Sequence, residues 1–394
     1  MRIYSAADET NIRIDRRVRE WVKSGLLRKD QEAGLLADVK VGLKRTNDSL
    51  RIVLFVMGII IGFSAVFLIG VTLSFREYGF GVLWVVAGVA SFFAAGVIID
   101  AGQYYRFGIE EAAAVASMVL IPVGVGVSSG FKVLSHNGPA IMMAACSVGI
   151  VVSLAVYLRY GYLYGAFGAI GYAIAVVHQM FNDKPAQLIA SAALLLVAFV
   201  VMTRLRRDAG DEYLGDDYGA IEAGSLLAAY VVVNLQLTNL GGVFPRSFLA
   251  LYPGWLYWAT YVATWIIPAI GLAVALRDKQ RSLLLASLGM AMLSFVTNKP
   301  YLGQERQAWD PIFFGGLLVG VALIVKRWLS SGANGYRHGY TATRLLAIDE
   351  RIMTAAATAS AALPHGAIGS PPATQDDLQA GGGRSGGAGS SGEF

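Results

Sequence analysis

No charged residue interrupts the stretch from Ile52 to Phe75, which reads IVLFVMGIIIGFSAVFLIGVTLSF. A run of about 20 apolar residues is long enough for a helix to cross the hydrocarbon core of a bilayer. This stretch therefore predicts a membrane-spanning helix.

Further apolar stretches follow it along the chain, and the same argument applies to each of them. Together they predict an all-α, polytopic transmembrane helical bundle of about ten spans. The predicted spans are Ile52–Phe75, Phe80–Ile99, Ala112–Phe131, Ala140–Leu158, Tyr162–Phe181, Ala186–Met202, Ala220–Leu237, Trp255–Leu276, Ser282–Thr297 and Pro311–Val325.

The composition agrees with a membrane protein. Hydrophobic residues make up 55% of the chain and charged residues only 15%, whereas soluble proteins are about 25% charged. The single cysteine, Cys146, excludes a disulfide within the chain and a cysteine-rich metal cluster.

Basic residues gather in alternate loops between the predicted spans, and this pattern predicts the orientation of the spans. The clusters 204–207 and 277–281 fall on the same predicted side as the many basic residues before Ile52. Cytoplasmic loops of membrane proteins carry the excess of Lys and Arg. The pattern therefore predicts a multi-pass protein of the inner (cytoplasmic) membrane with both termini cytoplasmic. Because the basic residues flank the spans, the net charge of +5 does not predict nucleic-acid binding.

Four regions are expected along the chain: residues 1–50, 51–328, 329–363 and 364–394. The first is a short cytosolic amphipathic helical hairpin, and the second is the transmembrane bundle. The third is a juxtamembrane segment in which one more helix can form, and the fourth is a Gly/Ser-rich disordered tail.

In the hairpin, one apolar stripe is expected to contain Ile14, Val18, Trp21 and Val22, while basic residues face outward. The second helix carries Leu35, Leu36, Val39 and Leu43 on one face. Two interpretations remain open. The hairpin is either a docking module that binds partners or anionic lipid headgroups, or a cap that rests on the bundle with a solvated basic face.

The predicted spans contain few ionisable side chains, although a charge in hydrocarbon is usually functional. The candidates are Glu222, His178, Glu110 and Glu111. Glu110, Glu111 and Glu222 also fit a plain stabilising role at a helix start, where the macrodipole favours carboxylates. A metal site from His136, His178 and Asp183 lacks any fixed spacing. We therefore predict no catalytic, cofactor-binding or metal site and no cofactor.

The seventh predicted span carries a polar face, because residues four apart stack on one side of a helix. Facing residues occur in the eighth span. The candidate polar face consists of Tyr230, Asn234, Gln236, Thr238, Thr260 and Thr264. Such residues either join neighbouring helices by hydrogen bonds or line a pathway for a small ligand.

Two motifs resemble a family of uncharacterised bacterial multi-span membrane proteins with an N-terminal helical hairpin. One is the run from Trp21 to Gln31, WVKSGLLRKDQ, and the other extends from Ile109 through Gly130 to the His-Asn-Gly turn at 136–138. The run Gly130–Val133 departs from the family pattern. The resemblance implies a bacterial inner-membrane protein and no particular reaction.

These observations favour a non-enzymatic scaffold, sensor or envelope component. Its expected partners are membrane lipids and proteins bound through the N-terminal hairpin and the C-terminal tail. The alternative is a transporter of a small neutral or amphipathic solute, built from inverted five-helix halves.

Overall fold

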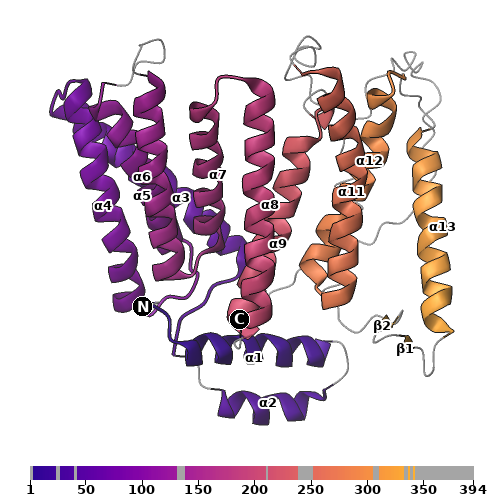
Figure 1. Ribbon diagram of the computed structural model, residues 1–394. Coiled ribbons are helices and arrows are strands. Elements are labelled where there is room, and N and C mark those ends of the chain that lie inside the picture. The colour runs from indigo at the N-terminus through magenta and orange to yellow at the C-terminus, as the bar shows by residue number, and fades with distance from the viewer. Residues whose placement is uncertain are drawn as a thin grey trace, which may run out of the picture.

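The computed structural model describes residues 3–23, 27–39, 42–130, 138–209, 212–237, 252–304, 310–331, 336–337 and 340–341. Their secondary structure is almost entirely helical (Figure 1). The helices are α1 (Ala6–Lys23), α2 (Lys29–Asp38), α3 (Asp48–Thr72), α4 (Glu77–Gly102), α5 (Ile109–Ser128), α6 (Gly138–Tyr160), α7 (Leu163–Met180), α8 (Lys184–Asp208), α9 (Glu212–Val233), α11 (Gly254–Asp278), α12 (Arg281–Tyr301) and α13 (Asp310–Ser330). Two short antiparallel strands, β1 (Tyr336–Arg337) and β2 (Tyr340–Thr341), follow α13.

Eight of the described helices, α3 to α8, α11 and α12, are long and apolar enough to cross a membrane. Their outer faces expose large apolar side chains, such as Ile52 at 63% and Leu68 at 65%. Exposed apolar surface on this scale marks contact with lipid rather than water. The chain is therefore a polytopic helical membrane protein, and the predicted fold class is confirmed at that level.

Eight of the ten predicted spans overlap these helices. The other two overlap α9, which contains Asp216, Asp217 and Glu222, and α13. Neither is among the eight apolar spans, so ten crossings remain a prediction.

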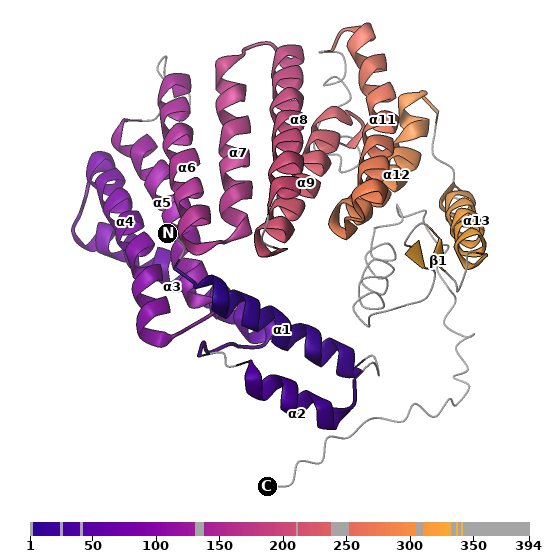
Figure 2. The same cartoon turned by 60° about the horizontal axis from the view of Figure 1, so that its bottom comes forward.

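The spanning helices stand side by side, and α1 and α2 lie across one end of them (Figure 1). We call this the basal end and the opposite one the apical end. Figure 2 shows α4 to α12 following one another around a curve in chain order. Most of the helices from α4 to α12 pack mainly on a neighbour in sequence, with the most extensive contacts between α4 and α5, α6 and α7, and α8 and α9, whereas α3 packs mainly on α5.

Helix α1 is attached to the basal end through one side. Ile12 and Val18 are each 2% exposed, and Ile12 packs in a core with Tyr105 and other basal residues. The predicted apolar stripe is wrong in part, because Ile14 and Trp21 are 40% and 39% exposed. The buried side also contains polar residues, so apolar spacing alone does not identify it.

The segments around α1 tie it to the bundle by backbone hydrogen bonds. The Ile3 N–H donates to the carbonyl of Arg159, at the end of α6, at 2.8 Å. Lys44 forms an isolated parallel bridge with Tyr104, in the loop between α4 and α5. The N-terminal unit is thus in contact with the ends of several bundle helices.

Some predicted features lie outside the described residues. These are Thr238, His136, the Gly/Ser-rich tail at 364–394 and most of the juxtamembrane segment at 329–363.

Candidate functional site

The polar face predicted for the seventh span is buried between α9 and α12. The Asn234 Nδ2 group donates to the Tyr230 hydroxyl at 2.9 Å and to the Thr297 hydroxyl at 3.0 Å. The Tyr230 hydroxyl also lies 3.0 Å from that of Ser294. Both Tyr230 and Asn234 are 0% exposed, so these contacts replace water as their hydrogen-bond partner.

A second group of contacts lies nearer the apical end and is centred on Tyr301. Its hydroxyl accepts a hydrogen bond from the backbone N–H of Leu235 at 2.8 Å, and its carbonyl accepts one from the Tyr257 hydroxyl at 3.0 Å. The Gln236 Nε2 group donates to the Tyr257 hydroxyl at 3.0 Å. We call the combined set the polar network; its members are Tyr230, Asn234, Gln236, Tyr257, Thr260, Thr264, Ser294, Thr297 and Tyr301.

The five described residues of the predicted polar face are all buried and all belong to this network. Asn234 and Gln236 lie just beyond the end of α9 at Val233, rather than within the helix as predicted. Thr264 of the eighth span is linked to the network through α12, because Ser294 donates to the backbone carbonyl of Thr264 at 2.6 Å. The Thr264 hydroxyl donates to a carbonyl of its own helix.

Replacing Tyr230 by phenylalanine should lower the free energy of unfolding by about 0.6–1.7 kcal/mol, the range for hydrogen bonds between membrane helices. The substitution removes the acceptor of the Asn234 amide and the partner of Ser294 while keeping the ring. Titration with SDS in mixed micelles measures the change. Tyr78→Phe, at a side chain 69% exposed, is the control and should have no effect.

The carboxylate of Glu222 lies in an ion-pair cluster at the basal end. It accepts hydrogen bonds from the Thr203 hydroxyl and from Arg206 Nε, both at 2.7 Å. Arg206 also pairs with Asp278, at the end of α11, and Arg207 Nε reaches the same carboxylate at 3.0 Å. We call these five residues the basal cluster. It joins α8, α9 and α11.

The prediction that Glu222 stabilises a helix start is wrong. Helix α9 begins at Glu212, so Glu222 lies well inside it. Its carboxylate is 0% exposed and is neutralised by Arg206 rather than by the helix terminus.

Glu110 and Glu111 lie in the first turn of α5, as predicted. One oxygen of Glu110 accepts the backbone N–H of Phe107, which precedes the helix. Glu111 forms a two-pronged ion pair with Arg51 of α3, whose Nε lies 2.8 Å from the carboxylate. Both glutamates are buried, and Glu110 Oε2 has no hydrogen-bond partner among the described residues.

Asp15 holds α1 to the segment before α3. Arg45 donates to its carboxylate at 2.6 Å and Arg19 at 3.1 Å. Burial alone would raise the pKa of Asp15, but the two guanidinium groups outweigh it and hold the pKa below its usual range.

Attachment of α1 should therefore depend on acidity. A lowered folded-state pKa contributes stability at pH values above the ordinary Asp pKa of about 3.9, and this contribution is lost as the pH falls through the lowered value. The protection factors of the α1 amides, which compare each exchange rate with the intrinsic rate at the same pH, should fall at acidic pH in the wild-type protein. In Asp15→Asn these factors should already be low at neutral pH and should vary less with pH.

His178 lies in the last turn of α7, where its backbone carbonyl accepts a hydrogen bond from Gln187 Nε2 at 3.0 Å. Within the described residues, no group of three His, Cys, Asp or Glu side chains could hold a metal ion. Of the suggested metal ligands, His136 lies outside those residues.

Sequence reasoning missed the partners of the buried acids, namely Arg51, Arg206 and Asp278. Each lies at the end of a helix, where a basic or acidic residue normally faces water. The predicted topology placed Arg51 and Glu111 at the same membrane face, so a search for opposite charges at one face could have found this pair.

Comparison of the chain with protein-family models, with curated proteins and with solved structures gives no match.

Proposed function

We propose that this chain is a non-enzymatic scaffold or sensor in a bacterial inner membrane, with both termini cytoplasmic. In this proposal the bundle is a rigid support, and the N-terminal helices α1 and α2 bind partners. The proposal includes membership of the uncharacterised membrane-protein family that the two sequence motifs resemble.

The arrangement of α1 carries the proposal. Its buried side holds it to the bundle, while Arg16, Arg17 and Lys23 on the remaining surface are exposed. An exposed basic surface held at a membrane face is suited to anionic partners. The buried polar residues of the spans support the same function, because most of them hydrogen-bond to side-chain or backbone groups within the bundle.

Cross-linking in native membranes followed by purification tests this proposal. The intact chain should retain a defined set of partners, and a variant with Arg16→Gln, Arg17→Gln and Lys23→Gln should lose part of it. A chain ending at residue 363 tests the tail. The control for the triple variant carries Arg204→Gln and Arg277→Gln, which change exposed basic residues elsewhere at the basal end. Identical partners for the intact chain and both test variants would rule out a scaffold that acts through these segments.

Transport of a small neutral or amphipathic solute is the second candidate, and one observation favours it. Asn234 Oδ1 is buried and has no hydrogen-bond partner among the described residues. A neutral solute with a hydroxyl or amide group could donate to it. Such a solute should raise the melting temperature of the wild-type protein but not that of Asn234→Leu, and equal shifts in both would contradict binding at this atom.

A further inference from the structure

The hairpins α6–α7 and α11–α12 have the same backbone geometry at the same place. Gly161 follows α6 with φ of 69°, and Lys279 follows α11 with φ of 53°. The next residues cap the second helix, with φ, ψ of −85°, 118° at Tyr162 and −93°, 115° at Gln280. The same left-handed conformation occurs at Gln103 after α4, with φ of 53°, so the turn geometry by itself does not relate the two hairpins.

The sequences before the two turns agree in the same register. Residues 154–159 read LAVYLR and residues 272–277 read LAVALR, a separation of 118 residues that also relates Gly161 to Lys279. The two hairpins therefore share a turn geometry and a short sequence in the same register.

Helices α5 and α9 align at a different separation, of 112 residues. The pair Ile109-Glu110 corresponds to Ile221-Glu222, and both glutamates are 0% exposed. Further along, the fully buried Ser117 corresponds to Ala229, which is also 0% exposed. The sequence Asp-Ala-Gly occurs at the end of the helix before each of them, at 100–102 in α4 and at 208–210 from the last residue of α8.

We infer from these similarities that the chain contains two related four-helix units, which we call unit 1 (α4 to α7) and unit 2 (α8, α9, α11 and α12). In each unit the first two helices pack together, the last two pack together, and the second contacts both of the last two. A unit with an even number of crossings is followed by a second copy in the same direction, which is a direct repeat. Transport through inverted five-helix halves would need a different relation between the halves.

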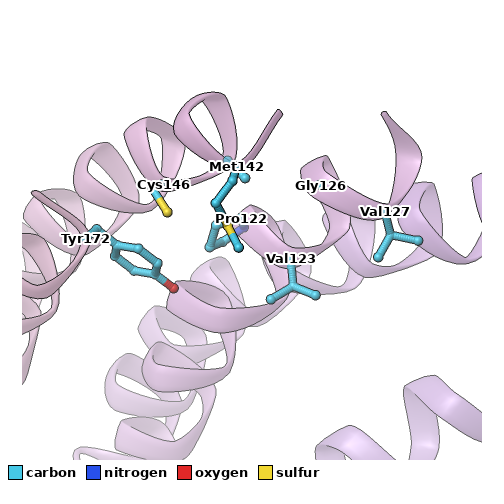
Figure 3. Close-up of a pocket in the computed structure, with 8 residues that line it drawn as sticks. Pro122, Val123, Gly126, Val127, Met142, Cys146 and Tyr172 are labelled. Carbon is cyan, nitrogen blue, oxygen red and sulfur yellow. The ribbon is translucent and has the colours of Figure 1, made fainter. Parts of the chain in front are cut away.

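This correspondence relates the polar network of unit 2 to an apolar cavity in unit 1. Pro122 corresponds to Asn234, Met142 to Thr260 and Cys146 to Thr264. The cavity measures about 160 Å³ and presents almost no polar surface. The cavity is lined by Pro122, Val123, Gly126, Val127, Met142, Ala145, Cys146 and Tyr172. Figure 3 draws these residues as sticks and labels all of them except Ala145.

One hydrogen bond fixes a wall of this cavity. Pro122 has no N–H, so the carbonyl of Met118, one turn earlier, lacks its usual helical partner. The Tyr172 hydroxyl of α7 donates to that carbonyl at 2.7 Å and holds the Tyr172 ring at the cavity. In unit 2, Asn234 keeps the equivalent N–H, which bonds to the Tyr230 carbonyl at 2.9 Å.

We propose that the unit 1 cavity binds the end of a hydrocarbon chain from a membrane lipid. An apolar cavity offers water too few partners, and one of about 150 Å³ can hold a benzene-sized molecule. This cavity lies within the spans α5, α6 and α7, and Val123 at its edge is 39% exposed toward the surroundings of the bundle. The hydrocarbon that surrounds these spans matches the lining in polarity.

Photo-cross-linking tests the site. The protein is reconstituted in phosphatidylcholine vesicles in which a small fraction of the lipid carries a diazirine near the end of one acyl chain. The wild-type protein should be labelled at residues that line the cavity. Gly126→Leu should lose most of this labelling, because the nearest atom to an added Cβ is Ala145 Cβ at 3.8 Å and the longer side chain extends into the cavity.

Gly171→Leu is the matched control. It lies next to Tyr172, and a Cβ there meets nothing within 4 Å, so its labelling should equal that of the wild type. Equal labelling in Gly126→Leu, or no labelling of the cavity in the wild type, would overturn the proposal.

Discussion

Replacing Arg206 by alanine should lower the free energy of unfolding by about 3–5 kcal/mol, because it leaves a buried carboxylate without its cation. Arg206 Nε lies 2.7 Å from Glu222 Oε2, and Glu222 is 0% exposed. The Thr203 hydroxyl bonds to the other oxygen of Glu222 but brings no charge. SDS titration in mixed micelles measures the loss.

Two further variants separate this effect from general damage at the basal end. Arg204→Ala changes an exposed arginine two residues away on α8 and should have little effect. Adding Glu222→Gln to Arg206→Ala should recover much of the lost stability, since a neutral amide costs less to bury than an unpaired carboxylate. If the double variant is as unstable as Arg206→Ala, the buried charge is not the cause.

The positions of the spans could be predicted because a membrane helix needs only length and apolarity. The same reasoning failed at α1, where the buried side includes Asp15 paired with Arg45. Apolar spacing ignores such a carboxylate and therefore selected Ile14 and Trp21, which are exposed. Glu222 was misplaced for a similar reason, because polar residues at the start of α9 resemble a loop.

The polar face was identified from α9, but its partners on α12 were not. Ser294, Thr297 and Tyr301 are common in helix interfaces and do not stand out in a short apolar stretch. The correspondence of the two units was also hidden, because few residues are identical. It becomes visible once the turns at Gly161 and Lys279 and the short sequences before them show where the units align.

The second large loss of stability is expected at the close contact between the spans α4 and α5. Gly81 and Gly124 face each other there, and a Cβ on Gly81 would lie 2.3 Å from the backbone nitrogen of Ser128. A Cβ on Gly124 would lie 2.6 Å from the carbonyl oxygen of Gly81. Since backbone atoms cannot rotate away, α4 and α5 must separate. Gly81→Ala should therefore lower the free energy of unfolding by about 3 kcal/mol, near the upper end of the usual cost of overpacking.

Gly62→Ala on α3 is the control, because a Cβ there meets nothing within 4 Å. Alanine is the better helix former, so this variant should be unchanged or more stable by up to about 1 kcal/mol. The double variant Gly81→Ala with Gly124→Ala distinguishes the mechanism. If the first substitution has already separated α4 and α5, the second should add less than its effect alone, because neighbouring sites that share one contact are not additive. Fully additive losses would show that each glycine acts through its own helix and not through their contact.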